Sequence, residues 1–226
     1  MANAWRHVML MSSLPALPRI ARARALPISG ERLRTRLGML APDDAATVGL
    51  AWDLVRWRRG AAAVLDAELV EQYERLGDSP AGRLVRRCVG PRLEAATALA
   101  ALRRRRDGEA AAPAVRWGVG ELATTIARHW THPDFGLAHR LPWLPQARAL
   151  LEQDEYLALE KLVLALAWQQ LEEADRRSTY ALGNVIVYVL KWDVLERWLS
   201  MDAARAASRF DALLDQVLHD QLAAIA

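Results

Sequence analysis

The chain is poor in cysteine, lysine and phenylalanine, and it has no long apolar run. A single cysteine, Cys88, among 226 residues excludes an intramolecular disulfide and is typical of a reducing compartment. Since no second cysteine accompanies it at metal-ligand spacing, we expect Cys88 to be a small buried apolar residue. The longest apolar runs, at 162–168 and 185–190, are far shorter than the roughly 20 residues of a membrane span. The apolar stretch at 8–11 is too short for a secretory signal, so we expect a cytoplasmic protein without a membrane span.

Charge is divided unevenly along the chain. Residues 1–106 contain 19 basic and 10 acidic residues, whereas residues 107–226 contain 11 basic and 17 acidic ones, giving balances of +9 and −6. Nearly all basic residues are arginine, which together with abundant alanine is typical of a biased genome composition and is weak support for nucleic-acid binding. The best domain boundary is RRRRDGEAAAP at 103–113. We therefore predict an arginine-rich N-terminal helical lobe at 1–106 and a C-terminal helical bundle at 107–226, with one continuous domain as the alternative.

Helix signals dominate after residue 30, and no segment alternates with a period of two for long. Helices are expected at 29 or 30 to 40, 43 or 44 to 59, 61–76, 81–102 with an interruption near Gly90–Pro91, 120–130, 146–151, 154–175, 178–202 and onward from 202. The last of them has a core face at Phe210, Leu213, Leu214, Val217 and Leu218. The expected fold class is all-α, a multi-helix bundle in two lobes.

The segment 180–202, YALGNVIVYVLKWDVLERWLSMD, is the most informative helix of the sequence. Its first apolar stripe is Val185, Tyr188, Trp192, Leu195 and Leu199, and its second is Val187, Val194 and Trp198. The solvent-facing side is predicted at Asp193, Glu196 and Arg197. Alternating steps of three and four in the first stripe indicate packing against the core. The second strip packs inside the chain or docks a partner, and both interpretations stay open.

No complete catalytic or metal-binding pattern is present. His129, His132 and His139 are clustered, but a proline ends the helix directly after the first pair and no cysteine or close carboxylate completes a tetrahedral site. The segment GVGELATT at 118–125 lacks the third glycine, the lysine and the preceding strand of a phosphate loop. The carboxylates within 152–160 are explained more simply by a helix macrodipole than by acid–base catalysis. We therefore expect no enzyme, no metal and no cofactor.

The strongest basic signal is a run of four arginines: Arg103, Arg104, Arg105 and Arg106. Consecutive positions point to all sides of a helix, and no aromatic residues are interleaved for base stacking, so nucleic acid is the less favoured partner. We expect a solvated helix end or a contact with an acidic protein. The candidate partner contacts are these four arginines together with Val187, Val194 and Trp198. Three tryptophans in less regular stretches are further candidate anchors: Trp5, Trp117 and Trp143.

Both ends of the chain carry a family resemblance. Its residues are MLMSSLPALP at 9–18, PISGERLRTRL at 27–37, LEKLVLALAWQQLEEADRRSTYALGNVIVYVLKWDVLERW at 159–198 and FDALLDQVL at 210–218. These stretches resemble proteins encoded within bacterial V-type (A/V-type) ATPase operons, near the genes for a stalk component and for the catalytic component of the motor. The likeness is weak through 59–118, and its motifs are packing motifs.

Proteins of that family are similar in helical character to the rotor-cap component of the same ATPases, which is designated C in the bacterial and d in the eukaryotic enzyme. This component is a funnel of helices that caps the membrane rotor ring and receives the central shaft. The resemblance implies a non-enzymatic protein that couples the soluble motor to the membrane rotor, lies beside the cell membrane through its partners, and works through contact surfaces. The rotor-cap component has three lobes, whereas this chain has room for about two. The alternative is a helical adaptor or assembly factor that binds the ATPase transiently.

Overall fold

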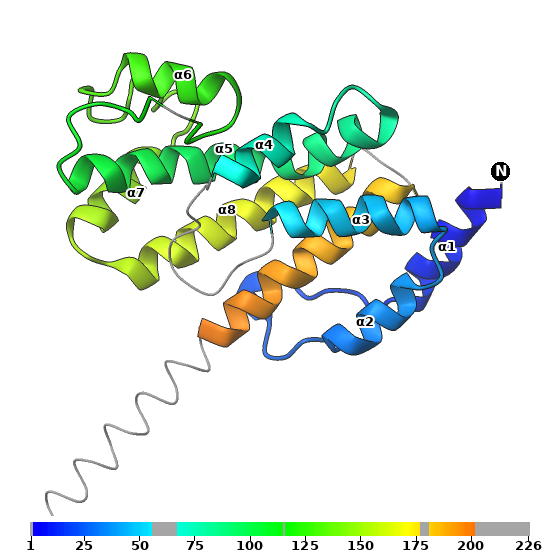
Figure 1. The fold of residues 1–226 in the computed structure, drawn as a ribbon. Coiled ribbons are helices and arrows are strands. Elements are labelled where there is room, and N and C mark those ends of the chain that lie inside the picture. The colour runs from blue at the N-terminus through cyan, green and yellow to red at the C-terminus, as the bar shows by residue number, and fades with distance from the viewer. Residues whose placement is uncertain (1, 56–66, 115, 177–180, 202–226) are drawn as a thin grey trace, which may run out of the picture.

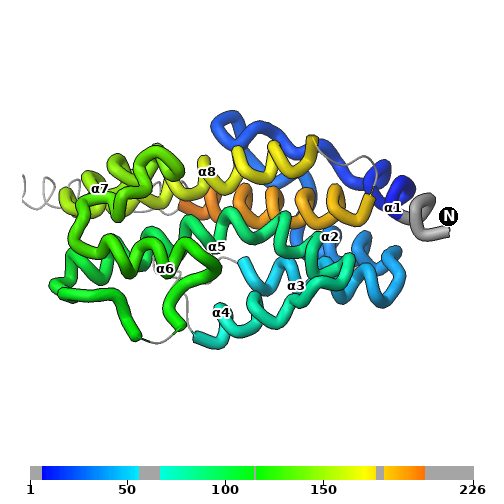
Figure 2. The backbone as a smooth tube through the Cα atoms, turned by 90° about the horizontal axis from the view of Figure 1, so that it is seen from above, coloured from blue at the N-terminus to red at the C-terminus, as the bar shows by residue number. Residues whose placement is uncertain are grey.

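The computed structural model describes residues 2–55, 67–114, 116–176 and 181–201, and every regular element within these ranges is a helix. In chain order they are α1 (Ala2–Ser13), η1 (Ile20–Arg22), α2 (Gly30–Leu37), α3 (Pro42–Val55), α4 (Ala67–Glu74), α5 (Pro80–Arg106), α6 (Gly120–Arg128), α7 (Leu144–Glu152), α8 (Tyr156–Arg176) and a helix at 182–201. They form a bundle that is elongated along α5 and α8 (Figure 1, Figure 2). The prediction of an all-α multi-helix fold is confirmed.

Local capping signals start several of these helices where the sequence predicts them. The side chain of Ser29 accepts a hydrogen bond from the backbone N–H of Arg32 (3.3 Å) and begins α2. The side chain of Ser79 accepts one from the backbone N–H of Gly82 (3.0 Å) and begins α5, one residue before the expected start at 81. Each cap satisfies one backbone donor that the first helical turn leaves without a partner.

The predicted interruption near Gly90–Pro91 is wrong, because α5 is a single helix of 27 residues that contains both residues. A proline inside a helix removes one backbone hydrogen bond. Val89 and Leu93 on either side of it are buried in the core, and this packing holds the helix together. A Cβ atom at Gly90 would lie 2.9 Å from the hydroxyl oxygen of Tyr73, so glycine allows α4 to pack closely on α5.

Two apolar cores share α5 and α8. The first core contains α5 as far as Leu93 and α8 from Leu164 onward, together with residues of α1 to α4 and of the 182–201 helix. The second contains α5 from Ala95, residues of α6 and α7, and Leu159 at the start of α8. The cores therefore meet within α5 and α8.

The 182–201 helix runs through the first core beside α3, α8 and the N-terminal segment (Figure 1). The hydroxyl of Tyr188 donates a hydrogen bond to the carbonyl oxygen of Pro15 (2.8 Å), and the indole N–H of Trp192 donates one to that of Ile28 (2.8 Å). The predicted first stripe is confirmed, since its first four residues are buried and Leu199 is partly buried against the core.

Some predicted features lie outside the described residues. They are the first part of the 61–76 helix, the expected start of the 178–202 helix, and the last helix from 202 with its proposed core face of Phe210, Leu213, Leu214, Val217 and Leu218. Among the described helices, none combines the length and the apolar character needed to cross a bilayer.

Candidate functional site

The predicted arginine run lies at the carboxyl end of α5, where Arg105 contacts the loop that follows α6. Its guanidinium donates hydrogen bonds to the backbone carbonyl oxygens of Trp130 (3.4 Å), His132 (2.5 Å) and Pro133. It also lies 4.6 Å from the centre of the Phe135 ring, within the range of a cation–π interaction. Burial lowers the pKa of Arg105. Arg105 therefore works inside the chain as a clamp between α5 and this loop.

Arg106 holds the turn between α7 and α8 in a similar way. Its Nη1 donates hydrogen bonds to the carbonyl oxygen of Leu151 (3.3 Å), the carboxylate of Asp154 (3.2 Å) and the hydroxyl of Tyr156 (2.8 Å). Its guanidinium carbon is 5.6 Å from the centre of the Tyr156 ring. These contacts occupy much of its hydrogen-bonding capacity.

The other two arginines of the run, Arg103 and Arg104, also interact with groups of the same chain. Burial, followed by the positive charge of Arg106, lowers the pKa of Arg103. Arg104 forms an ion pair with Glu109 (3.3 Å) at the surface. The run is thus divided among separate local contacts, because adjacent residues of a helix point in different directions. It does not present four free cations to one partner.

Three of the four carboxylates within 152–160 pair with basic residues: those of Glu152, Asp154 and Glu160. Glu152 lies 3.1 Å from Arg148, and Glu160 accepts a hydrogen bond of 2.7 Å from Arg197. The structure therefore distributes these three acidic residues among separate ion pairs.

The second apolar strip of the 182–201 helix is not an open surface. Val187 is 2% exposed and Val194 is fully buried, so neither can contact a partner. Trp198 is partly buried against the first core, and the ammonium of Lys161 lies 5.3 Å from its ring centre. The partner interpretation of this strip is therefore wrong at Val187 and Val194, because the helix has neighbours on more sides than the two stripes indicate.

The predicted solvent-facing side of the same helix is wrong at Asp193, which is 5% exposed. Its Oδ1 accepts a hydrogen bond from the indole N–H of Trp52 in α3 (3.2 Å), and its Oδ2 lies 3.7 Å from Nη1 of Arg92 in α5. Burial lowers the pKa of Arg92 to about 10, against the opposing effect of the Asp193 charge. Arg197 pairs with Glu160 and not with Asp193. These polar groups join three helices inside the first core.

The histidines lie in small local networks. Nδ1 of His129 lies 3.0 Å from the carbonyl oxygen of Thr125, and Nδ1 of His132 lies 2.5 Å from the Asp134 carboxylate. In the parts of the chain that the structure describes, no three metal-type side chains are arranged to hold an ion. The structure does not bring His139 into either network.

Two of the three tryptophans predicted as exposed anchors are core residues. Trp117 and Trp143 are 8% and 9% exposed and belong to the second core, so their prediction as exposed anchors is wrong. The loops that carry them pack onto the carboxyl half of α5. The side chain of Trp5 lies outside the described residues. Cys88 is buried as predicted, and burial raises the pKa of its thiol to about 11.

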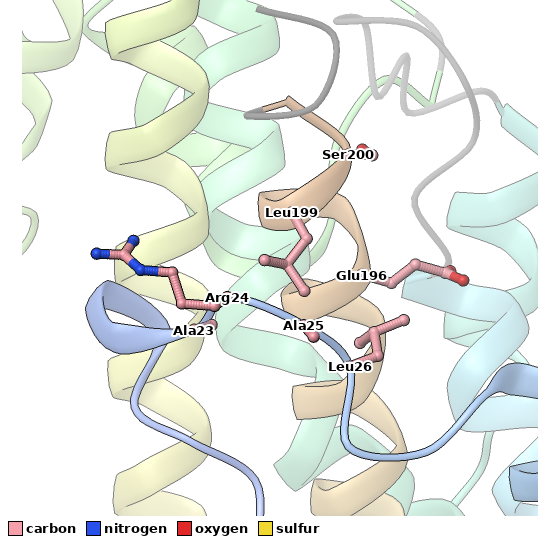
Figure 3. A pocket seen from close by; sticks show the side chains of 7 residues that line it. All are labelled: Ala23, Arg24, Ala25, Leu26, Glu196, Leu199 and Ser200. Carbon is pink, nitrogen blue, oxygen red and sulfur yellow. The ribbon is translucent and has the colours of Figure 1, made fainter. Parts of the chain in front are cut away.

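A hollow of about 610 Å³ opens where the segment between η1 and α2 crosses the carboxyl end of the 182–201 helix (Figure 3). It is lined by Ala23, Arg24, Ala25, Leu26, Glu196, Leu199 and Ser200. The side chains of Arg24 and Glu196 extend to opposite sides of it, while the alanines and leucines form its apolar part (Figure 3). The hollow is open to solvent and has an apolar floor with charged groups at its edge.

Three arginines at η1 and directly after it accompany this hollow, and we call them the N-terminal arginine surface: Arg19, Arg22 and Arg24. Arg24 lines the hollow itself. Three more arginines of α2 are Arg32, Arg34 and Arg36, but Arg34 lies on the opposite side of that helix from the other two. All six are exposed, and no guanidinium among them forms a hydrogen bond or ion pair with another described residue. Sequence reasoning concentrated on the run at 103–106 and missed this surface. The signal that could have found it is the presence of six arginines and one acidic residue, Glu31, within 19–36.

Comparison with known proteins identifies a family. A family model described as "Protein of unknown function (DUF2764)" matches residues 90–221, which is more than half of the chain. No curated protein and no solved structure matches. The matched region begins within α5, includes the second core and the 182–201 helix, and crosses the predicted boundary at residue 106.

Proposed function

The chain belongs to the DUF2764 family of proteins of unknown function, and we propose that it is a non-enzymatic helical component of a V-type ATPase. In this role it couples the soluble motor to the membrane rotor or assists their assembly. Its partners are then components of the central stalk or of the rotor. The end motifs at 9–37 and 159–218 that resemble proteins of V-type ATPase operons point to this class of assembly.

The observation that carries the proposal is that α5 and α8 belong to both cores. With 27 residues, α5 is about 40 Å long, and it packs against α3 and α4 in one half and against α6 and α7 in the other. Since interiors are densely packed, a displacement at one core is transmitted to the other through these two helices. Such a continuous connection suits a protein that holds two partners in a fixed relation.

Native purification of the ATPase from cells that carry a tagged full-length chain tests the proposal. We expect components of the ATPase to co-purify with the tagged chain and not with a tag-only control. A constant stoichiometry in the active enzyme would identify a permanent component, whereas enrichment in incomplete complexes would identify an assembly factor. The absence of ATPase components from the purified material would contradict both roles.

Deletion of the gene tests the coupling role separately. We expect membrane vesicles from the deletion strain to lose ATP-driven ion transport, and the wild-type chain to restore it. If the ATPase assembles fully and transports ions at the normal rate without the chain, both coupling and assembly are refuted. The nucleic-acid alternative has lost its main support, because Arg105 and Arg106 are engaged within the chain.

A further inference from the structure

We infer that the N-terminal arginine surface and the hollow beside it bind an acidic amphipathic helix of a partner protein. The inference rests on the proposed function only in that the chain acts by binding another protein. It adds the surface that is used and the chemistry of the segment that it recognises.

The charges of the surface are available to a partner. Arg19, Arg22 and Arg24 are exposed and form no hydrogen bonds or ion pairs with the described residues through their guanidinium groups, in contrast to Arg105 and Arg106. Glu31 is the one acidic residue between positions 19 and 36. A guanidinium presents a planar fork of donors that matches a carboxylate in a bidentate arrangement. The side of the hollow that carries Arg24 therefore complements glutamate or aspartate side chains, whereas Glu196 lies on the opposite side (Figure 3).

The hollow adds a requirement for apolar groups. Leu26 and Leu199 contribute to its lining with Ala23 and Ala25, and its volume of about 610 Å³ has room for large side chains. Because it is open to solvent, it suits side chains that project from a partner surface (Figure 3). A helix with apolar residues at spacings of three and four, flanked by carboxylates, offers both chemistries at once.

Two other anionic partners fit the surface less well. A nucleic acid would satisfy the arginines through its phosphates, but stacking of bases needs aromatic side chains, and the sequence from 19 to 40 contains none. An anionic membrane would need protruding apolar groups to enter the lipid, whereas the apolar residues beside Arg24 line a hollow. An acidic protein helix accounts for both the charge and the hollow.

Selection from a random peptide library on the immobilised full-length chain tests the inference, followed by fluorescence anisotropy with the enriched peptides. We expect enriched peptides to be acidic and amphipathic, and their affinity to fall as salt is raised. Arg24→Glu should weaken binding about tenfold or more by reversing one charge. Ala25→Trp should do the same by filling the hollow, since Ala25 is exposed and the larger side chain does not disturb the core. Arg128→Glu, an exposed arginine at the end of α6, is the matched control and should leave binding unchanged.

The inference is overturned if enriched peptides lack acidic residues, or if Arg24→Glu and Ala25→Trp bind them as the wild type does. It is also overturned if a short DNA duplex or vesicles containing phosphatidylglycerol bind these arginines more tightly than the peptides. Self-association of the wild type that Arg24→Glu abolishes would assign the surface to a second copy instead. A variant that loses peptide binding but still co-purifies with the ATPase would leave the proposed function intact, so the two failures are distinguishable.

Discussion

Replacement of Asp193 by alanine tests how the polar groups inside the first core contribute to stability. The side chain is 5% exposed and contacts two other helices, through the indole N–H of Trp52 and the guanidinium of Arg92. The substitution removes a carboxylate and leaves the buried Arg92 without the charge of Asp193. We therefore expect a loss of stability larger than that of any change at the surface.

The size of the loss follows from the geometry. Removal of one partner from a buried ion pair costs about 3–5 kcal/mol. The oxygen–nitrogen distance of 3.7 Å is longer than that of a hydrogen-bonded pair, and Trp52 is only partly buried, so its N–H can turn to water. We therefore expect the lower end of the range, about 3 kcal/mol. Replacing both partners, as Arg92→Met with Asp193→Leu, should recover most of it, because apolar replacements of buried pairs are often neutral.

Urea unfolding followed by far-UV circular dichroism measures the effect. With an m-value of about 2 kcal/mol/M, a loss of about 3 kcal/mol lowers the midpoint by about 1.5 M. Asp53→Ala is the matched control, since Asp53 is an exposed aspartate on α3, and it should change stability by less than about 0.5 kcal/mol. The reasoning is refuted if Asp193→Ala costs no more than this control. A double variant no more stable than Asp193→Ala would refute the coupling of the pair.

Three further predictions concern packing. Arg105→Ala should lower the free energy of unfolding by about 2 kcal/mol, because it leaves carbonyl oxygens without a donor. Arg104→Ala should lower it by less than about 0.5 kcal/mol. Equal losses in thermal unfolding would contradict the role of Arg105 in joining α5 to the loop after α6. The thiol of Cys88, with its pKa raised to about 11, should react with a disulfide reagent far more slowly in the folded than in the unfolded chain. Because the pKa is higher in the folded chain, the contribution of the protonated thiol to stability is complete below pH 9.0 and is lost as pH rises through 11. Gly49→Ala should raise the free energy of unfolding in urea by about 0.5–1 kcal/mol, whereas Gly82→Ala should lower it because a Cβ there would overlap a backbone carbonyl oxygen.

Local sequence signals predicted much of the helical pattern. The helix expected from 29 or 30 begins at Gly30 with Ser29 as its cap, and the stripe of Val185, Tyr188 and Trp192 is buried. These features depend on residues only a few positions apart, so propensity, capping and periodicity describe them without a knowledge of distant neighbours.

The candidate partner contacts were predicted less well. Val187 and Val194 are buried, Arg105 and Arg106 contact segments that lie between 25 and 50 residues further along the chain, and the arginines at 19–36 had no distinct motif. Whether a cation is free or paired depends on which distant backbone or carboxylate reaches it. The number of arginines in a stretch of sequence does not predict which of them are paired.

The sequence by itself determined the all-helical character, the residues that start helices, and the apolar stripes that enter a core. Only the tertiary structure decided how many sides of the 182–201 helix are covered and which arginines stay free. The reason is visible at Asp193, which was predicted to face solvent but accepts a hydrogen bond from Trp52, 141 positions away along the chain. A helical period gives the direction of each side chain, but the neighbour in that direction comes from the fold.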